Sequence, residues 1–422
     1  MRELFGQGAR AFLLSNGSFA INFLGNLALV RILTPEIFGT YALAIALIGG
    51  IEVFTTFALH TVYLQRRPSQ RLLAAILQAF LGIGLVKCLA VLVLFLALRG
   101  HYGADVWTMF AIVFAAKLIV PLNALLIAML EKQFRFGRSA FITAFSNSAS
   151  VFAAVATGLL GGGIYSLAVR DVLPILIGLG VGLWLNRSVK IKWRRFDWRQ
   201  SRTLLRSGME MYAARASELA FSKLPLILVE RLFGIEVLGY LHQAMYLVNS
   251  VNRVTMMLNQ QIALVYFNRH RRDRAKTQEG FRVLLAVSVG LGLLAAPLLM
   301  FFPETVVRTL WGEDWIAASG MLRIMSALIF IIPVFTILKS QLYGQRRTLW
   351  IAGTYLAGSV VIVPLLMGLR TLHSPVIAVS IAYLATFALL MMIAGRGLFG
   401  WPAERAASAG GPRMALQEGP AD

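Results

Sequence analysis

Long apolar runs alternate with short polar segments along the whole chain. A run of about 20 apolar residues is long enough for an α-helix to cross the hydrocarbon core of a bilayer. Twelve runs reach this length, and each is predicted to form a transmembrane helix. The predicted spans are residues 11–32, 41–63, 72–98, 106–130, 141–160, 164–185, 207–233, 237–267, 281–302, 316–343, 349–369 and 376–394. The pattern therefore predicts an all-α polytopic membrane protein.

The loops between these spans differ in their content of lysine and arginine. Basic residues collect in the cytoplasmic loops of membrane proteins. One alternating set of segments, which includes both termini, carries most of them. The other set carries only Arg31, Arg99, Arg231, Arg308 and Arg370. We therefore expect both termini to be cytoplasmic.

Composition agrees with a membrane protein and narrows the function. The 422 residues are 58% hydrophobic and 14% charged, and the net charge of +21 is mostly loop charge, so no nucleic-acid partner is expected. Cys88 is the single cysteine, which excludes an intrachain disulfide and a multi-cysteine metal site. No Walker A, HExxH, CxxC or GxSxG motif occurs, and no large aqueous loop is predicted. We expect neither an enzyme nor a bound cofactor or metal.

An internal repeat divides the chain into two halves. An offset of 200 residues aligns VRILTPEIFGTYALA (30–44) with ERLFGIEVLGYLHQA (230–244) and matches Gly39 with Gly239. Six spans per half give both copies the same orientation, so the repeats are parallel and related by an axis along the membrane normal. The predicted units are an N-lobe (1–186), a basic cytoplasmic linker (187–206), a C-lobe (207–395) and a disordered cytoplasmic tail (396–422).

Basic residues interrupt the apolar spans and are the main functional signal. A charge in hydrocarbon costs roughly 2.5 to 3.5 kcal/mol on insertion scales, so such residues usually face a bundle interior or a wet cavity. The cations within spans are Lys87, Lys117, Arg170, Arg215, Lys223, Arg253, Arg323 and Lys339. Arg170 and Lys339 are expected to extend toward the interface instead. Cations around a cavity favour an anionic passenger.

Polar residues at helical spacing indicate which faces line this cavity. In the eighth span, His242, Tyr246, Asn249, Arg253 and Gln260 form one polar stripe, and Ser15, Ser18 and Asn22 form another in the first span. The predicted substrate-binding cations are Arg253, Lys117, Arg215, Lys87 and Lys223, with His242, Tyr246, Asn249, Gln260 and Asn22 as polar cavity residues. Glu52 and Glu218 are candidate ion-coupling residues.

Structural roles remain open for several of these residues. Arg215 and Glu218 are three positions apart on one helix and can pair with each other. Lys87 and Lys117 can pair with Glu52 or Asp171 across helices. His242 lies toward the end of its span, where a histidine is more often a hydrogen-bonding residue than a proton carrier.

The sequence resembles a known transporter family. The run SNGSFAINFLGNLALVRILTPEIFGTYALAIAL (15–47), its copy ERLFGIEVLGY and the segment LWGEDWIAASGMLRIMSALIF (310–330) are similar to blocks of the polysaccharide transporter family. These Wzx-type flippases belong to the multidrug/oligosaccharidyl-lipid/polysaccharide exporter superfamily. The resemblance implies two six-helix lobes around a cationic cavity in the bacterial inner membrane. It also implies transport of undecaprenyl-pyrophosphate-linked oligosaccharides for O-antigen, capsule or exopolysaccharide biosynthesis.

Two other functions remain alternatives. A drug/cation antiporter of the same superfamily would need a cavity dominated by carboxylates, whereas cations outnumber Glu52, Asp171 and Glu218 in the spans. A polysaccharide polymerase or ligase would need a catalytic loop. The expected partners of a flippase are the lipid-linked oligosaccharide, membrane lipids, and the polymerase and other assembly proteins of the pathway.

Overall fold

The structure is a computed structural model, and it describes residues 2–55, 63–64, 69–187, 198–258, 263–270, 273–345, 347–372 and 374–399. Within these ranges every regular element is a helix. The elements are α1 (Arg2–Ile32), α2 (Pro35–Thr55), α4 (Gln70–Leu98), α5 (Ala104–Lys132), α6 (Phe136–Leu159), α7 (Ile164–Leu185), α8 (Trp198–Phe233), α9 (Ile235–Leu258), α10 (Leu264–Arg269), α11 (Arg274–Phe301), α12 (Pro303–Leu310), η2 (Glu313–Trp315), α13 (Ala318–Met325), α14 (Leu328–Gly344), α15 (Thr348–Gly368), η3 (Leu369–Thr371) and α16 (Pro375–Phe399). The all-α prediction is confirmed.

The long helices account for the predicted spans. In the described part of the chain, nine helices are long and apolar enough to cross a membrane, and the bent pair α13 and α14 makes up to ten. The helices α8 and α9 are too polar to meet that standard, although they cover two further predicted spans. Helix α4 exposes apolar side chains of the kind that face lipid, since Leu81, Leu89 and Val93 are more than half exposed.

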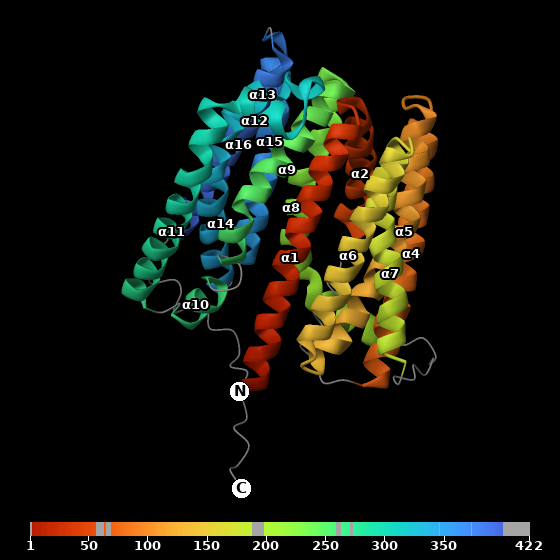
Figure 1. Cartoon of the computed structure of the whole chain (residues 1–422). Helices are drawn as coiled ribbons and strands as arrows, with labels where there is room; N and C mark the ends of the chain where they lie inside the picture. The colour runs from red at the N-terminus through yellow and green to blue at the C-terminus, as the bar shows by residue number, and fades with distance from the viewer. Residues whose placement is uncertain are drawn as a thin grey trace.

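Two lobes of helices lie side by side, with their long axes running between the two ends of the bundle (Figure 1). The repeat predicts equivalent packing in each lobe, and the contacts follow it: α1 packs on α6 as α8 packs on α15, and α5 packs on α7 as α14 packs on α16. The equivalent helices α2 and α9 pack against each other across the lobes. The pseudo-symmetry axis therefore passes between α2 and α9.

A pair of equivalent glycines makes the α2–α9 contact close. A Cβ on Gly39 would fall on the carbonyl oxygen of Ile235, and a Cβ on Gly239 would fall on the carbonyl oxygen of Pro35. These four residues are related by the 200-residue offset of the repeat. Each glycine thus admits the backbone of the other lobe, as small residues do where membrane helices touch.

Further contacts join the lobes at the upper end of Figure 1, where α1 ends and α12 lies. The indole Nε1 of Trp315 donates to the carbonyl oxygen of Val30 at 2.9 Å. Arg31 donates from Nε to the carbonyl oxygen of Leu310 at 3.2 Å. The ring of Phe38 lies edge-on to Trp315, with centroids 5.4 Å apart. Both lobes are therefore tied together at this end.

One predicted span differs from the structure for an identifiable reason. The tenth predicted span, 316–343, is two helices that meet at 45°. At the break the hydroxyl of Ser326 donates to the carbonyl oxygen of Arg323 at 2.6 Å, an alternative to regular backbone pairing. The eighth predicted span, 237–267, contains α9 and α10, and residues 259–262 between these helices lie outside the described residues. The described part of α8, Trp198–Phe233, includes residues before the predicted seventh span, 207–233.

Candidate functional site

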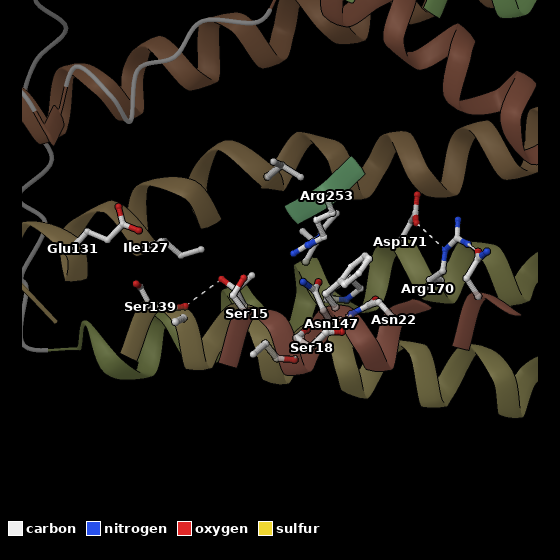
Figure 2. Close-up of a pocket in the computed structure, with 18 of the residues that line it drawn as sticks. Ser15, Ser18, Asn22, Ile127, Glu131, Ser139, Asn147, Arg170, Asp171 and Arg253 are labelled. Carbon is white, nitrogen blue, oxygen red and sulfur yellow. Dashed lines mark hydrogen bonds and ion pairs between the residues drawn. The ribbon is translucent and has the colours of Figure 1, made fainter. Parts of the chain in front are cut away.

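A cavity of about 1040 Å³ lies between α1, α5, α6 and α7 of one lobe and α9 of the other (Figure 2). Its lining combines cations, carboxylates, amides, hydroxyls and aromatic rings. The lining residues are Ser15, Ser18, Phe19, Asn22, Asn26, Lys117, Val120, Ile127, Glu131, Phe136, Ser139, Ala140, Thr143, Ala144, Asn147, Arg170, Asp171, Pro174, Ile175, Tyr246 and Arg253. Four of the predicted site residues meet here, namely Arg253, Lys117, Tyr246 and Asn22.

Helix α9 contributes the C-lobe side of the cavity. Tyr246 and Arg253 are two helical turns apart, so both side chains point from one face of the helix. The guanidinium carbon of Arg253 lies 4.1 Å from the ring centroid of Phe19 on α1. A cation over an aromatic face is attracted by the ring, with about 0.5 to 2 kcal/mol in favour of the contact. Phe19 thus holds Arg253 in place while its side chain stays exposed to the cavity.

Arg170 lies on the cavity wall, not at the interface where it was expected. Its Nη1 donates to the Oδ1 of Asn26 at 2.9 Å, and its Nε lies 3.5 Å from Oδ1 of Asp171. Tyr41 donates its hydroxyl to the other oxygen of Asp171 at 2.6 Å, and its ring centroid is 5.0 Å from the guanidinium carbon of Arg170. These partners satisfy a charge deep in the bundle, so the side chain has no need to reach the helix end.

A wall of uncharged polar side chains faces the cavity from α1 and α6. On α1, Asn22 lines the cavity, and its Nδ2 donates to the carbonyl oxygen of Ser18 at 2.7 Å. On α6, Ser139, Thr143 and Asn147 are each four positions apart and share one face. The polar stripe on α6 was not predicted from the sequence, although the four-residue spacing of these three residues indicates it.

Three of the predicted cations lie outside the cavity lining. Arg215 pairs with Glu218 at 3.2 Å, as the three-residue spacing allows. Glu218 also accepts from the Nζ of Lys339 at 3.1 Å, and from the hydroxyl of Tyr355 at 3.3 Å. Lys339 was expected to extend to the interface, but this carboxylate holds it inside the C-lobe with 15% of its side chain exposed. Glu218 is therefore part of a structural ion-pair cluster.

Lys87 and Lys223 belong to a second charged group behind the cavity. Lys87 is 7% exposed and interacts electrostatically with Glu52 and Lys117. Lys223 interacts with Glu52 and Lys117 as well. Its side chain lies over Gly49, where an added Cβ would be 2.5 Å from the Lys223 Cγ. Glu52 thus stands between cations of two lobes, and Lys117 is the member that reaches the cavity.

The other predicted residues do not line the cavity. His242 lies between two aromatic rings, with centroids 5.5 Å from Tyr41 and 6.2 Å from Phe38. Asn249 is exposed on α9. Gln260 lies outside the described residues, as do parts of the predicted linker (188–197) and tail (400–422). Among the described residues, no group of three or more His, Cys, Asp or Glu side chains is arranged to hold a metal ion.

The sequence is similar to proteins of polysaccharide biosynthesis. The family described as "Polysaccharide biosynthesis protein" matches residues 28–320. The chain is 24% identical over 323 residues to the succinoglycan biosynthesis transport protein ExoT of Rhizobium meliloti (strain 1021), which covers 74% of this chain. It is 24% identical over 225 residues, or 51% of its length, to the teichuronic acid biosynthesis protein TuaB of Bacillus subtilis (strain 168). The matches span 63% and 45% of these two relatives.

Solved structures share the fold over nearly the whole chain. The inward closed conformation of the lipid II flippase MurJ has a TM-score of 0.65 at 12% identity, over 94% of this chain and 89% of that one. The inward-facing conformation of a multidrug resistance MATE family transporter of the MOP superfamily has a TM-score of 0.63 at 15% identity, over 94% of both chains. At such identities the likeness establishes the fold alone.

Proposed function

The chain belongs to the polysaccharide biosynthesis protein family and has the fold of MOP superfamily transporters, and on that premise we propose that it is a lipid-linked oligosaccharide flippase. The proposed substrate is an undecaprenyl-pyrophosphate-linked repeat unit, moved from the cytoplasmic to the periplasmic leaflet of the bacterial inner membrane. One observation carries this proposal most directly. The cavity presents cations from both lobes, Arg253 on α9 and Lys117 on α5.

The diphosphate is proposed to bind at these cations. Phosphate oxygens removed from bulk water need charge-assisted hydrogen bonds, and the planar guanidinium of arginine offers two parallel donors. Arg253 is held by the ring of Phe19 without a carboxylate partner among the described residues, so its charge is available to a ligand. Lys117 adds a second positive charge on the N-lobe side, and Arg170, which contacts Asp171 at 3.5 Å, adds a third at the deeper end of the cavity.

The sugars are proposed to contact the uncharged wall of α1 and α6. Serine, threonine and asparagine side chains can both donate and accept hydrogen bonds, which suits the hydroxyl groups of a glycan. Ser15, Asn22, Thr143 and Asn147 present such groups along the cavity. A volume of about 1040 Å³ reaches the upper end of the range for drug-sized ligand pockets, so a group larger than one sugar fits. The polyprenyl chain would stay in the lipid.

The transport direction follows from the charge asymmetry of the loops. The segment between α5 and α6, at the end where the N-terminus lies in Figure 1, carries the basic residues Lys132, Arg135 and Arg138, and the positive-inside rule supports our proposal that this end is cytoplasmic. The cavity extends from Glu131 and Phe136 near this end to Asn26 and Arg170. The contacts between the lobes at the opposite end separate the cavity from the periplasm. A substrate would therefore enter from the cytoplasmic side.

Binding measurements on purified protein test the proposal. We expect wild-type protein in nanodiscs to bind undecaprenyl pyrophosphate, and Arg253→Ala to weaken binding by about 10- to 100-fold, the size of a lost charged hydrogen bond. Arg323→Ala is the matched control, because Arg323 is an exposed cation on α13 outside the cavity lining. Equal affinities for wild type and Arg253→Ala would contradict the assignment of the phosphate site.

A further inference from the structure

A chain of hydrogen bonds at the deep end of the cavity joins the two lobes. Asn26 of α1 donates from Nδ2 to Oε1 of Gln243 on α9 at 3.1 Å. The two side chains are 1% and 0% exposed. A buried amide that loses its partner costs about 1 to 3 kcal/mol. The Asn26–Gln243 hydrogen bond is therefore a direct, water-shielded polar contact between the N-lobe and the C-lobe.

The same Asn26 amide also contacts the cavity wall. Its Oδ1 accepts from Nη1 of Arg170 at 2.9 Å, and Arg170 lines the cavity with 15% of its side chain exposed. A charged donor on the oxygen of an amide polarises the group and strengthens its N–H as a donor. The Arg170–Asn26 hydrogen bond therefore reinforces the contact that Asn26 makes with Gln243.

An anion in the cavity would compete for Arg170. The ion pair between Arg170 and Asp171 is weak, because the Nε–Oδ1 distance is 3.5 Å and the other carboxylate oxygen accepts a hydrogen bond from Tyr41 at 2.6 Å. A diphosphate carries more charge than the neutral Asn26 oxygen and accepts two parallel donors. Arg170 would turn toward such a ligand and release Asn26.

We infer that Asn26 is a positioning residue that transmits anion binding at Arg170 to the lobe contact at Gln243. This inference rests on the proposed function. When the diphosphate engages Arg170, the Asn26–Gln243 hydrogen bond loses its charged support and the lobes separate more readily at the periplasmic end. The bound substrate itself thus favours the change that releases it to the other leaflet. A ligand shifts such an equilibrium by its difference in affinity for the two states.

The distance between the lobes can be measured directly. In a Cys88→Ser background, spin labels at Thr34 and Glu304 place one exposed probe on each lobe at the periplasmic end. Double electron–electron resonance in nanodiscs then reports the open fraction with undecaprenyl pyrophosphate or with undecaprenol, which lacks the diphosphate. We expect the diphosphate to raise the open fraction of the wild-type lobes about fivefold, the worth of one neutral hydrogen bond, and undecaprenol to leave it unchanged.

Two substitutions at Gln243 separate transmission from binding. Gln243→Met removes the acceptor, so we expect a raised open fraction without ligand and a response to the diphosphate below twofold. Gln243→Glu keeps an acceptor oxygen, and the Nε2 that it removes has no hydrogen-bond partner among the described residues, so it should hold the lobes closed without ligand and still open with the diphosphate. Lobes that bind the diphosphate without opening, or an equal response in Gln243→Met, would refute this inference alone. Wild-type protein that does not bind it would refute the proposed function as well.

Discussion

The reciprocal glycine contact between α2 and α9 makes a sharp prediction about the end of the bundle at which the two lobes meet. Alanine at Gly39 would place its Cβ 2.8 Å from the carbonyl carbon and 3.1 Å from Cγ1 of Ile235. Alanine at Gly239 would place its Cβ 2.9 Å from the carbonyl carbon of Pro35. The clashing atoms are mostly backbone, which cannot rotate aside, so the two helices must move apart.

The magnitude follows from what the added methyl group does in each of the two states. Glycine to alanine in an unhindered helix stabilises it by about 1 kcal/mol. Overpacking of a close contact costs about 1 to 3 kcal/mol and falls only on the state in which the lobes touch. The helix gain is the same in both states and cancels, so we expect a net cost near 2 kcal/mol for the state in which the lobes touch here, which corresponds to a shift of about 30-fold toward the open state.

The assay uses the labelled Thr34–Glu304 pair with Gly39→Ala, Gly239→Ala and a control. Gly17 on α1 has no neighbouring atom within 4 Å of an added Cβ, so Gly17→Ala makes the same chemical change without the clash. We expect both interface variants to populate the state in which this end is open, whereas Gly17→Ala should keep the wild-type distances. If Gly39→Ala and Gly17→Ala gave the same distance distribution, the close α2–α9 contact would be refuted.

Two further predictions concern stability. Glu218→Ala leaves Lys339 without its carboxylate partner and should lower the stability of the C-lobe by about 2 kcal/mol. This is less than the loss of a fully buried pair would cost, because the Glu218 side chain is 27% exposed. Thermal unfolding in detergent measures the loss of stability, and the additional substitution Lys339→Met should restore most of it. Equal melting temperatures for Glu218→Ala and wild type would contradict the pairing. Asp273 begins α11, and the backbone N–H of Lys276 holds the pKa of its carboxylate below the ordinary 3.8. The ionised cap therefore stabilises α11 above pH 3.8, and this stabilisation is lost as the pH falls through the lowered pKa. Asp273→Ala should abolish this part of the acid dependence, whereas Asp273→Asn should keep a cap that does not depend on pH. Identical acid unfolding of wild type and Asp273→Ala would contradict it.

Much of the fold could be predicted because the bilayer imposes simple rules on the sequence. Length and apolar composition located the spans, and the 200-residue repeat brought Gly39 and Gly239 into correspondence before their contact was visible. The break between α13 and α14 was missed, because composition alone does not reveal that Ser326 bonds the backbone of Arg323. Local hydrogen bonding of this kind depends on a rotamer, which periodicity does not specify.

The site was only partly predictable, because depth in a span does not determine the direction of a side chain. Arg253 and Lys117 were expected at the cavity and lie there. Arg170 was expected at the interface, but partners on two other helices, Asn26 and Tyr41, hold it at the cavity wall. Lys339 differs for the same reason, since Glu218 comes close to it only after α8 and α14 have folded together. Contacts between helices distant in sequence decide which cations meet a ligand.

The most direct test of the proposed transport is made in cells that lack this protein. Mass spectrometry of lipid extracts should show that complete undecaprenyl-pyrophosphate-linked repeat units accumulate. Wild-type protein and Arg323→Ala should clear them, whereas Arg253→Ala expressed at the same level should not. Lipid extracts without such intermediates, or normal clearance by Arg253→Ala, would contradict the proposal that the cations of this cavity carry the substrate across.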